Sequence, residues 1–243
     1  MIEERSRTRV VAAFVGAVGI AGASLFAVLV HLDLRHGLDH MNWVAFSLFS
    51  ILLFLGETQP KLWMRFGEGG EVTPGWAFAY ALVLLGSPSG AVIVMVLTNL
   101  FVDVRHRKGA LKIVFNVSQV AAALSLGGLL LHALGVHEGI TGTDHLPLRV
   151  GFGIVGGGLL IFIVNGLLTA SVICLHQGIG LVTMMRSGFA LSMAVDGALL
   201  ALAPVFVIAI EFSILMLPLL GITSFLVFHS ARTALKREHE ANH

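Results

Sequence analysis

The chain has 243 residues, of which 56% are apolar and only 12% are charged, and its mean hydropathy is +0.91. Soluble domains carry roughly 25% charged residues, so most of this surface must face lipid, and the composition excludes a soluble globular protein. The net charge is +1 and the basic residues cluster in loops, which argues against nucleic-acid binding. The single cysteine, Cys174, has no partner for an intrachain disulfide.

Apolar runs of membrane-crossing length dominate the sequence. A helix needs roughly 20 apolar residues to cross the hydrocarbon core, and by that measure the chain is expected to fold as an all-α, polytopic membrane bundle of about eight spans. The expected spans cover residues 10–30, 43–56, 73–85, 89–104, 110–134 and 147–175, and a block at 189–228 that is right in length for two spans turning near Glu211. Loops are expected between the spans, including residues 31–42 and 57–72.

The third and fourth expected spans form a hairpin of short helices. The apolar run at residues 73–104 is too long for one crossing, and a Gly-Ser-Pro-Ser-Gly segment at residues 86–90 interrupts it. Proline and glycine cannot continue a helix there, and small polar side chains can satisfy the freed backbone groups. A basic segment at residues 105–108 follows. Both ends of the hairpin are therefore expected on the cytoplasmic side, where basic loops are retained.

The distribution of basic residues supports this threading. With eight spans and cytoplasmic N and C termini, only Arg35 and Arg149 among the 15 Lys and Arg residues fall on outer segments. Seven spans, or a hairpin counted as one crossing, would put basic loops on both sides of the membrane. We therefore expect a multi-pass membrane protein with both termini inside.

Small residues mark the expected close contacts between helices. The first expected span carries a shallow groove formed by Gly16, Gly19 and Gly22. The sixth expected span is rich in glycine near its start, at residues 151–158. Such residues let helix backbones approach closely in a membrane. Both spans are thus expected to make close crossings with a neighbour.

Polar side chains within the spans are the first candidate site, because such groups are costly in a bilayer and often functional. Asn116 and Gln119 are three residues apart and share one face of the fifth span. Asn99, Asn165 and Asp196 are expected at comparable depths. Together these side chains could bind a polar ligand or a cation, or they could join helices through hydrogen bonds worth about 0.6 kcal/mol each.

Histidines expected at the outer face are the second candidate site. His36, His40, His137 and His145 lie near aspartates and a glutamate in the sequence, and imidazole and carboxylate suit a divalent metal. Histidine also titrates at roughly pH 6.5. A metal site, a pH sensor and a set of solvated loop side chains all fit this pattern. No phosphate-binding Gly-rich loop, His-Glu-x-x-His, Gly-x-Ser-x-Gly or Cys-x-x-Cys motif occurs, so the sequence supports neither an active site nor a particular cofactor.

Several motifs, taken in order, resemble a known family. They are Gly56-Glu57 followed by Pro60, Gly-Gly-Glu-Val-Thr at residues 69–73, the basic segment at 105–108, Phe115-Asn116 with Gln119, and the polar tail at 235–243. This order resembles the multi-helix membrane input domains of bacterial GGDEF-type diguanylate cyclases, and the tail is similar to the helix that leads into a GGDEF domain. Pro60 lies one residue further from Glu57 than in that pattern. The resemblance covers most of residues 50–243.

The resemblance implies a transmembrane sensor domain at residues 1–230 and a cytoplasmic linker helix at residues 231–243. Leu235 and Lys236 would then transmit the signal of an unknown small ligand to a cyclic di-GMP output domain. The resemblance also implies a homodimer in the bacterial inner membrane, and a chain that is not itself an enzyme. A small-solute transporter or a substrate-binding membrane subunit is the alternative, since interrupted helices and polar groups at mid-depth are also transporter features. A purely structural membrane anchor is a third possibility.

Overall fold

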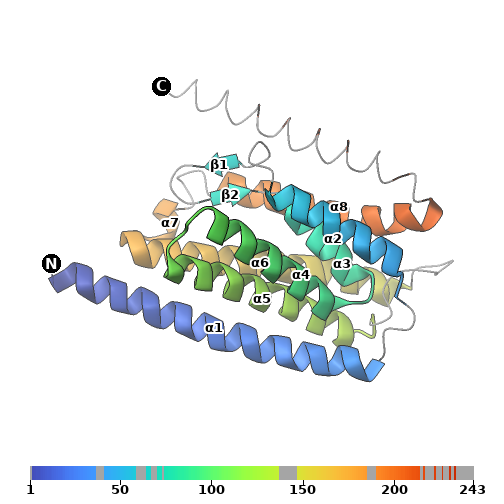
Figure 1. Cartoon of the computed structure of the whole chain (residues 1–243), viewed down its shortest axis with the longest axis horizontal. Coiled ribbons are helices and arrows are strands. Elements are labelled where there is room, and N and C mark those ends of the chain that lie inside the picture. Colours follow the sequence, from blue (N-terminus) through green and yellow to red (C-terminus); the bar gives the residue numbers. More distant parts are fainter. Residues whose placement is uncertain are drawn as a thin grey trace.

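The structure is a computed structural model that describes residues 2–36, 41–58, 64–66, 70–72, 74–136, 147–184 and 190–213, and single backbone positions at 216, 222, 226, 230 and 233. Helices dominate this part of the chain (Figure 1). The elements are α1 (Ile2–His36), α2 (Trp43–Thr58), β1 (Met64–Phe66), β2 (Gly70–Val72), α3 (Gly75–Leu84), α4 (Pro88–Arg105), α5 (Ala110–Ala133), α6 (Leu148–Gln177), α7 (Leu181–Met184) and α8 (Ala190–Phe212). The two strands pair in an antiparallel ladder that aligns Arg65 with Glu71.

The chain is a helical membrane protein. By length and composition, five of the described helices can cross a membrane: Arg7–His36, Pro88–Arg105, Ala110–Ala133, Leu148–Gln177 and Met193–Ile210. Two apolar helices are shorter, Trp43–Thr58 and Gly75–Leu84. Each of these seven helices overlaps an expected span, whereas the eighth expected span lies mostly outside the described residues.

Two expectations about the segments between spans were wrong. Residues 31–36, expected in a loop, continue α1 to His36, because His31 to Arg35 carry no glycine or proline that would stop the helix. Within residues 57–72, expected as a loop, the β1–β2 ladder forms. Helix α8 ends at Phe212, one residue after Glu211, near which the turn was expected.

The α3–α4 hairpin has its expected turn. Helix α3 ends at Leu84, Gly86 takes a left-handed φ of 88°, and α4 begins at Pro88. A positive φ favours glycine, and the fixed φ of proline suits the first turn of a helix, where no backbone N–H is needed. The remaining residues of the interrupting segment, Ser89 and Gly90, belong to α4.

All ten residues of α3 are buried, and this short helix lies inside the bundle. The Phe78 ring stacks between Phe49 of α2 and Phe206 of α8, at centroid distances of 6.4 and 5.6 Å. On another side, the Tyr80 hydroxyl donates a hydrogen bond to the backbone carbonyl of Ile154 on α6. At about 1.5 Å per residue, α3 is roughly 15 Å long, so neighbouring helices enclose it within a fraction of the membrane thickness.

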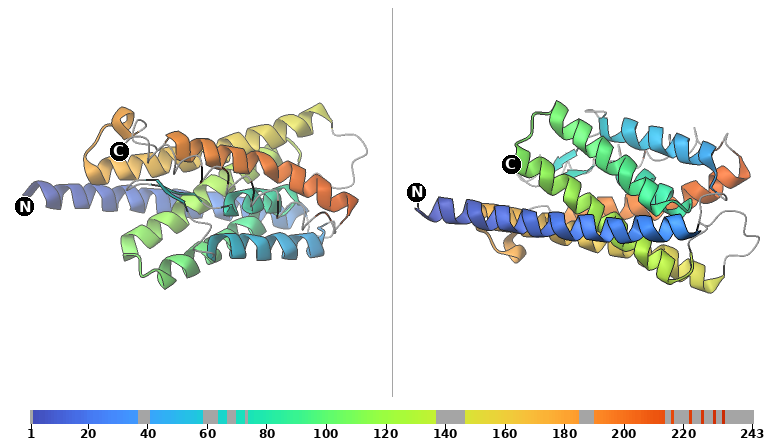
Figure 2. Two further views of the ribbon diagram at one scale, coloured as in Figure 1. Left: turned by 90° about the horizontal axis from the view of Figure 1, so that it is seen from above. Right: turned by 60° about the horizontal axis from the view of Figure 1, so that its bottom comes forward.

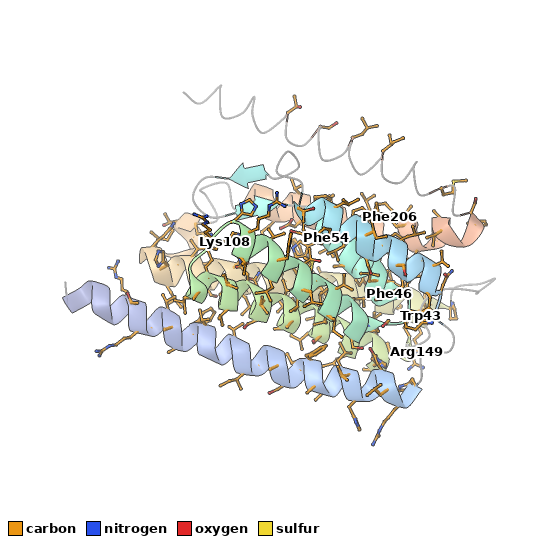
Figure 3. The ribbon with its side chains drawn as sticks, viewed as in Figure 1. Trp43, Phe46, Phe54, Lys108, Arg149 and Phe206 are labelled. Carbon is orange, nitrogen blue, oxygen red and sulfur yellow. The ribbon has the colours of Figure 1, made fainter. Side chains whose placement is uncertain are left out.

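The bundle has two chemically distinct ends. Figure 1 shows the N-terminus of α1, the β1–β2 ladder, the α4–α5 connection and the C-terminus of α6 at one end, which we call the basic end because Arg7, Arg105 and Lys108 lie there. The opposite end holds Arg35 and Arg149. In Figure 3, Lys108 and Arg149 accordingly lie at opposite ends of the molecule.

Helix α1 crosses α5 closely, and Figure 2 shows it lying along one face of the bundle. A Cβ atom on Gly22 would come within 2.7 Å of the carbonyl oxygen of Ser118 on α5, and one on Gly19 within 3.4 Å of the Ser118 hydroxyl. By contrast, a Cβ on Gly16 would meet nothing within 4 Å. The expected close crossing is therefore confirmed at Gly22 and Gly19, and Gly16 does not take part in it.

This contact gives a stability prediction with a control on the same helix. Gly22→Val should lower the free energy of unfolding by about 2 kcal/mol, because the added side chain must push two backbones apart. Gly16→Val should change it by less than about 0.5 kcal/mol. Reversible unfolding of the purified protein in mixed detergent micelles measures both. Equal losses for the two variants would contradict the crossing.

Candidate functional site

The polar side chains of α5 bond to three different neighbouring helices. Asn116 reaches α4, Gln119 reaches α6 and His132 reaches α1. The 16 residues from Asn116 to His132 correspond to about 24 Å of helix, so these contacts extend over most of the membrane thickness. We call them the inner, middle and outer clusters, and together they form the candidate site.

The inner cluster surrounds the buried carboxylate of Asp103 on α4. Asn116 donates from Nδ2 to Oδ2 of Asp103 at 2.7 Å, and Lys108 Nζ lies 2.7 Å from Oδ1. Only 1% of the Asp103 side chain and 14% of that of Lys108 are exposed. A buried charge is tolerated only when it is paired and hydrogen-bonded, so the cluster fixes the α4–α5 connection against both helices.

The middle cluster joins α5 to α6. Gln119 donates from Nε2 to Oδ1 of Asn165 at 2.5 Å and to the hydroxyl oxygen of Thr169 at 2.7 Å. The Thr169 hydroxyl in turn donates to the backbone carbonyl of Asn165 at 2.8 Å. These hydrogen bonds hold the two helices in one register.

The outer cluster joins α1, α5 and the start of α4 around Asp33. Its Oδ1 lies 2.6 Å from Nε2 of His132, and its Oδ2 accepts the backbone N–H of Ser89 at 2.8 Å. Ser89 lies in the first turn of α4, where backbone N–H groups lack helical partners and a carboxylate is favourable. The His36 ring packs against that of His132 at a centroid distance of 5.3 Å.

The structure brings together some of the predicted ligand-binding residues and separates others. Gln119 and Asn165 are hydrogen-bonded, while Asn116 bonds to Asp103 instead. Asn99 donates to the carbonyl of Met95, one turn earlier on its own helix. In the described part of the chain, no hydrogen bond links Asn99 or Asp196 to the middle cluster.

Asp196 lies apart from the α5 contacts, on α8. One of its carboxylate oxygens is buried without a hydrogen-bond partner, and the group interacts electrostatically with Glu57. Glu57 is itself buried at the end of α2, where it packs against Gly75 at the start of α3. Glu57 thus lies at the N-terminus of α3, within electrostatic range of Asp196.

The predicted metal ligands lie mostly outside the described residues. This is the case for His40, His137 and His145. His36 is described, and within the residues the structure covers no three His, Cys, Asp or Glu side chains are grouped closely enough to hold a metal ion. The proposed signal-transmitting residues Leu235 and Lys236 also lie outside the described part.

Sequence reasoning did not foresee two of these pairings. Asp33 and His132 are 99 residues apart in the sequence. Asp103 and Lys108 flank the α4–α5 connection. The available signal was a lone carboxylate inside an apolar run, which in a membrane requires a partner.

No family model, curated protein or solved structure matches the chain. The hydrogen bonds of the three clusters join side chains that lie on different helices. What they can do is couple helices: a change at either end of α5 alters the hydrogen bonds that fix the helix against its neighbours.

Proposed function

We propose that this chain is a membrane-embedded signal-input domain that senses a ligand or a membrane state and regulates a cytoplasmic output domain. The observation that carries the proposal is the set of polar contacts along α5, which ties the outer, middle and inner clusters to a single helix. A rigid helix whose two ends are hydrogen-bonded to neighbouring helices is suited to transmit a movement of one helix from one side of the membrane to the other.

The proposed topology has eight spans with both termini in the cytoplasm. The basic end would face inward, since cytoplasmic segments are enriched in Lys and Arg. Helix α3 and α2 then count as short spans, and the eighth span follows α8. In this arrangement the α4–α5 connection lies at the cytoplasmic surface of the bacterial inner membrane.

The proposed output is a GGDEF-type domain that makes cyclic di-GMP. The support is the resemblance of residues 235–243 to the helix that leads into such a domain. Leu235 and Lys236 would pass a movement of the last span to it, and the chain would act as a homodimer, because two output domains must meet to form product. The input domain itself contributes no catalytic residue.

The mechanism is a two-state rearrangement of helices. A ligand shifts such an equilibrium only by binding one state better than the other. The amides of Asn116, Gln119 and Asn165 can exchange their interhelical bonds for bonds to a polar ligand, so the ligand would favour the state in which α5 has moved relative to α6.

A chimera tests this function. Residues 1–243 are fused to a GGDEF domain, and cyclic di-GMP synthesis is measured in membranes. Gln119→Leu and Asn116→Leu should change synthesis by about twofold to thirtyfold, which corresponds to coupling energies of 0.5–2 kcal/mol. Ser50→Ala is the control, since the Ser50 hydroxyl donates to the Phe46 carbonyl on its own helix and, within the described residues, to no other helix. Unchanged synthesis in both amide variants would reject the relay.

A small-solute transporter is the rival function, favoured by the buried carboxylate of Asp196 and by the short, enclosed helix α3. Acidic groups inside spans often mark ion pathways. Uptake of a labelled solute by proteoliposomes that contain only this chain, abolished by Asp196→Asn, would favour the transporter. The signal-input function predicts no uptake.

A further inference from the structure

An apolar groove runs along the outward face of α4. It has a volume of about 360 Å³ and is lined by Leu97, Leu100, Phe101, Val104 and Arg105. These apolar side chains are exposed, so the groove opens away from the protein core and, in a helix that crosses the membrane, toward lipid. The ring of Phe101 packs against that of Phe54 on α2, with 5.4 Å between the ring centroids.

The groove belongs to a longer apolar stripe that matches one membrane leaflet. Exposed side chains recur along α4 from Ile93 to Val104. These eleven steps correspond to about 16 Å of helix, and half of the ~30 Å hydrocarbon core is about 15 Å. An acyl chain that follows the stripe from mid-membrane would therefore bring its headgroup to Arg105, the last residue of α4.

Arg105 lines the end of the groove, and Arg107 lies two residues further along the chain; both residues are exposed. Within the described residues, neither Arg105 nor Arg107 has an ion-pair partner, whereas the neighbouring Lys108 pairs with Asp103. The backbone N–H of Arg107 donates to the carbonyl of Val104 at 3.0 Å and that of Lys108 to the carbonyl of Asp103 at 3.0 Å. The basic segment is thus held in a fixed turn in which two arginines remain available to an anion.

We propose that this groove binds an anionic phospholipid, with the phosphate on Arg105 and Arg107 and one acyl chain along the α4 stripe. Arginine suits this role because its planar guanidinium donates two hydrogen bonds to one phosphate. Basic residues at this depth attract anionic lipid by about a factor of five each. The bound lipid would rest on the same α4–α5 connection that the inner cluster fixes from the protein side.

Arg149 at the opposite end provides a natural contrast. Like Arg105, it lies at one end of a stripe of exposed apolar side chains, in this case on α6. Its guanidinium, however, lies against Gly135 at the C-terminus of α5, where a Cβ atom would be 3.0 Å away. A cation there interacts favourably with the helix end, so Arg149 is already engaged and should contribute little to lipid binding.

The test uses the full chain purified in an uncharged detergent. Dioleoyl-phosphatidylglycerol is titrated into the protein, and dioleoyl-phosphatidylcholine is titrated in a parallel sample for comparison. The melting temperature of the protein and the lipid retained in native mass spectrometry are measured in both. Phosphatidylglycerol at tenfold excess over its Kd should raise the melting temperature by about 3 °C. Arg105→Ala should weaken its binding roughly fivefold, the double change with Arg107→Ala should weaken it further, and Arg149→Ala should leave it unchanged.

Three results would overturn the proposal. Equal phosphatidylglycerol binding by the wild type and by Arg105→Ala would show that the groove is not the site. A similar stabilisation by glycerol phosphate alone would indicate a site for a free anion. A loss of dimer in Arg105→Ala, without a change in retained lipid, would assign the groove to a second copy of the chain.

Discussion

Lys108→Ala should destabilise the bundle by about 3 kcal/mol, because the substitution leaves the buried carboxylate of Asp103 without its cation. Among the described residues, Asn116 would remain as the hydrogen-bond donor to a side chain that is 1% exposed. The Asn116 amide cannot neutralise the charge, so the carboxylate would stay buried without compensation. Reversible unfolding in mixed detergent micelles measures the loss as a shift of the midpoint.

A second substitution separates charge pairing from packing. Adding Asp103→Asn to Lys108→Ala should recover at least half of the lost stability, because the double variant no longer buries an uncompensated charge. Lys112→Ala is the matched control: Lys112 is exposed, and its removal should cost less than about 0.5 kcal/mol. If the double variant were as unstable as Lys108→Ala alone, the loss would come from packing and not from the ion pair.

Asp33→Ala should cost roughly 2–4 kcal/mol, since one carboxylate joins three helices at the opposite end. The substitution removes the acceptor for the Ser89 N–H in the first turn of α4 and the partner of His132 on α5. Both Asp33 and His132 are about 95% buried, so water cannot replace the lost contacts at little cost. The destabilisation should therefore appear in thermal unfolding and as faster hydrogen exchange at the start of α4.

Replacement by asparagine distinguishes the two contacts of Asp33. Asp33→Asn keeps an oxygen that can accept the Ser89 N–H but removes the charge beside His132, so about half of the alanine effect should remain. Arg35→Ala, at an exposed position two residues away, should be nearly neutral. Identical losses for the alanine and asparagine variants would show that the N–H contact contributes nothing.

The helices of the bundle were predictable because each depends on local information. Apolar runs of sufficient length, separated by glycine, proline and charge, place the seven membrane-type helices, and the interruption before Pro88 places the hairpin turn. The extension of α1 to His36 is harder to predict, because polar residues after an apolar run are typical of a loop. Nothing in that segment stops a helix, and Asp33 is polar because it is bonded within the bundle.

The sequence indicates which polar residues are buried in the bundle, but it does not indicate which residues they bond to. Asn116, Gln119 and Asn165 were selected as buried polar groups, and the structure places all three in interhelical hydrogen bonds. Which group meets which depends on helix rotation and crossing, and no local pattern encodes these. The burial of α3 was missed for the same reason: its residues are as apolar as those of a lipid-facing span, and only the surrounding helices decide what they touch.

The enclosed position of α3 has a consequence for biosynthesis. Its partner α8 begins about 100 residues later in the chain, a delay of roughly 5–20 s at a translation rate of about 5–20 residues per second. During that interval a helix only ~15 Å long has a flank that is still uncovered. This segment must therefore stay at the insertion machinery, or associate transiently with α2 and α4, until the ribosome has synthesised the C-terminal third of the chain. Only then can α8 cover the exposed flank of α3.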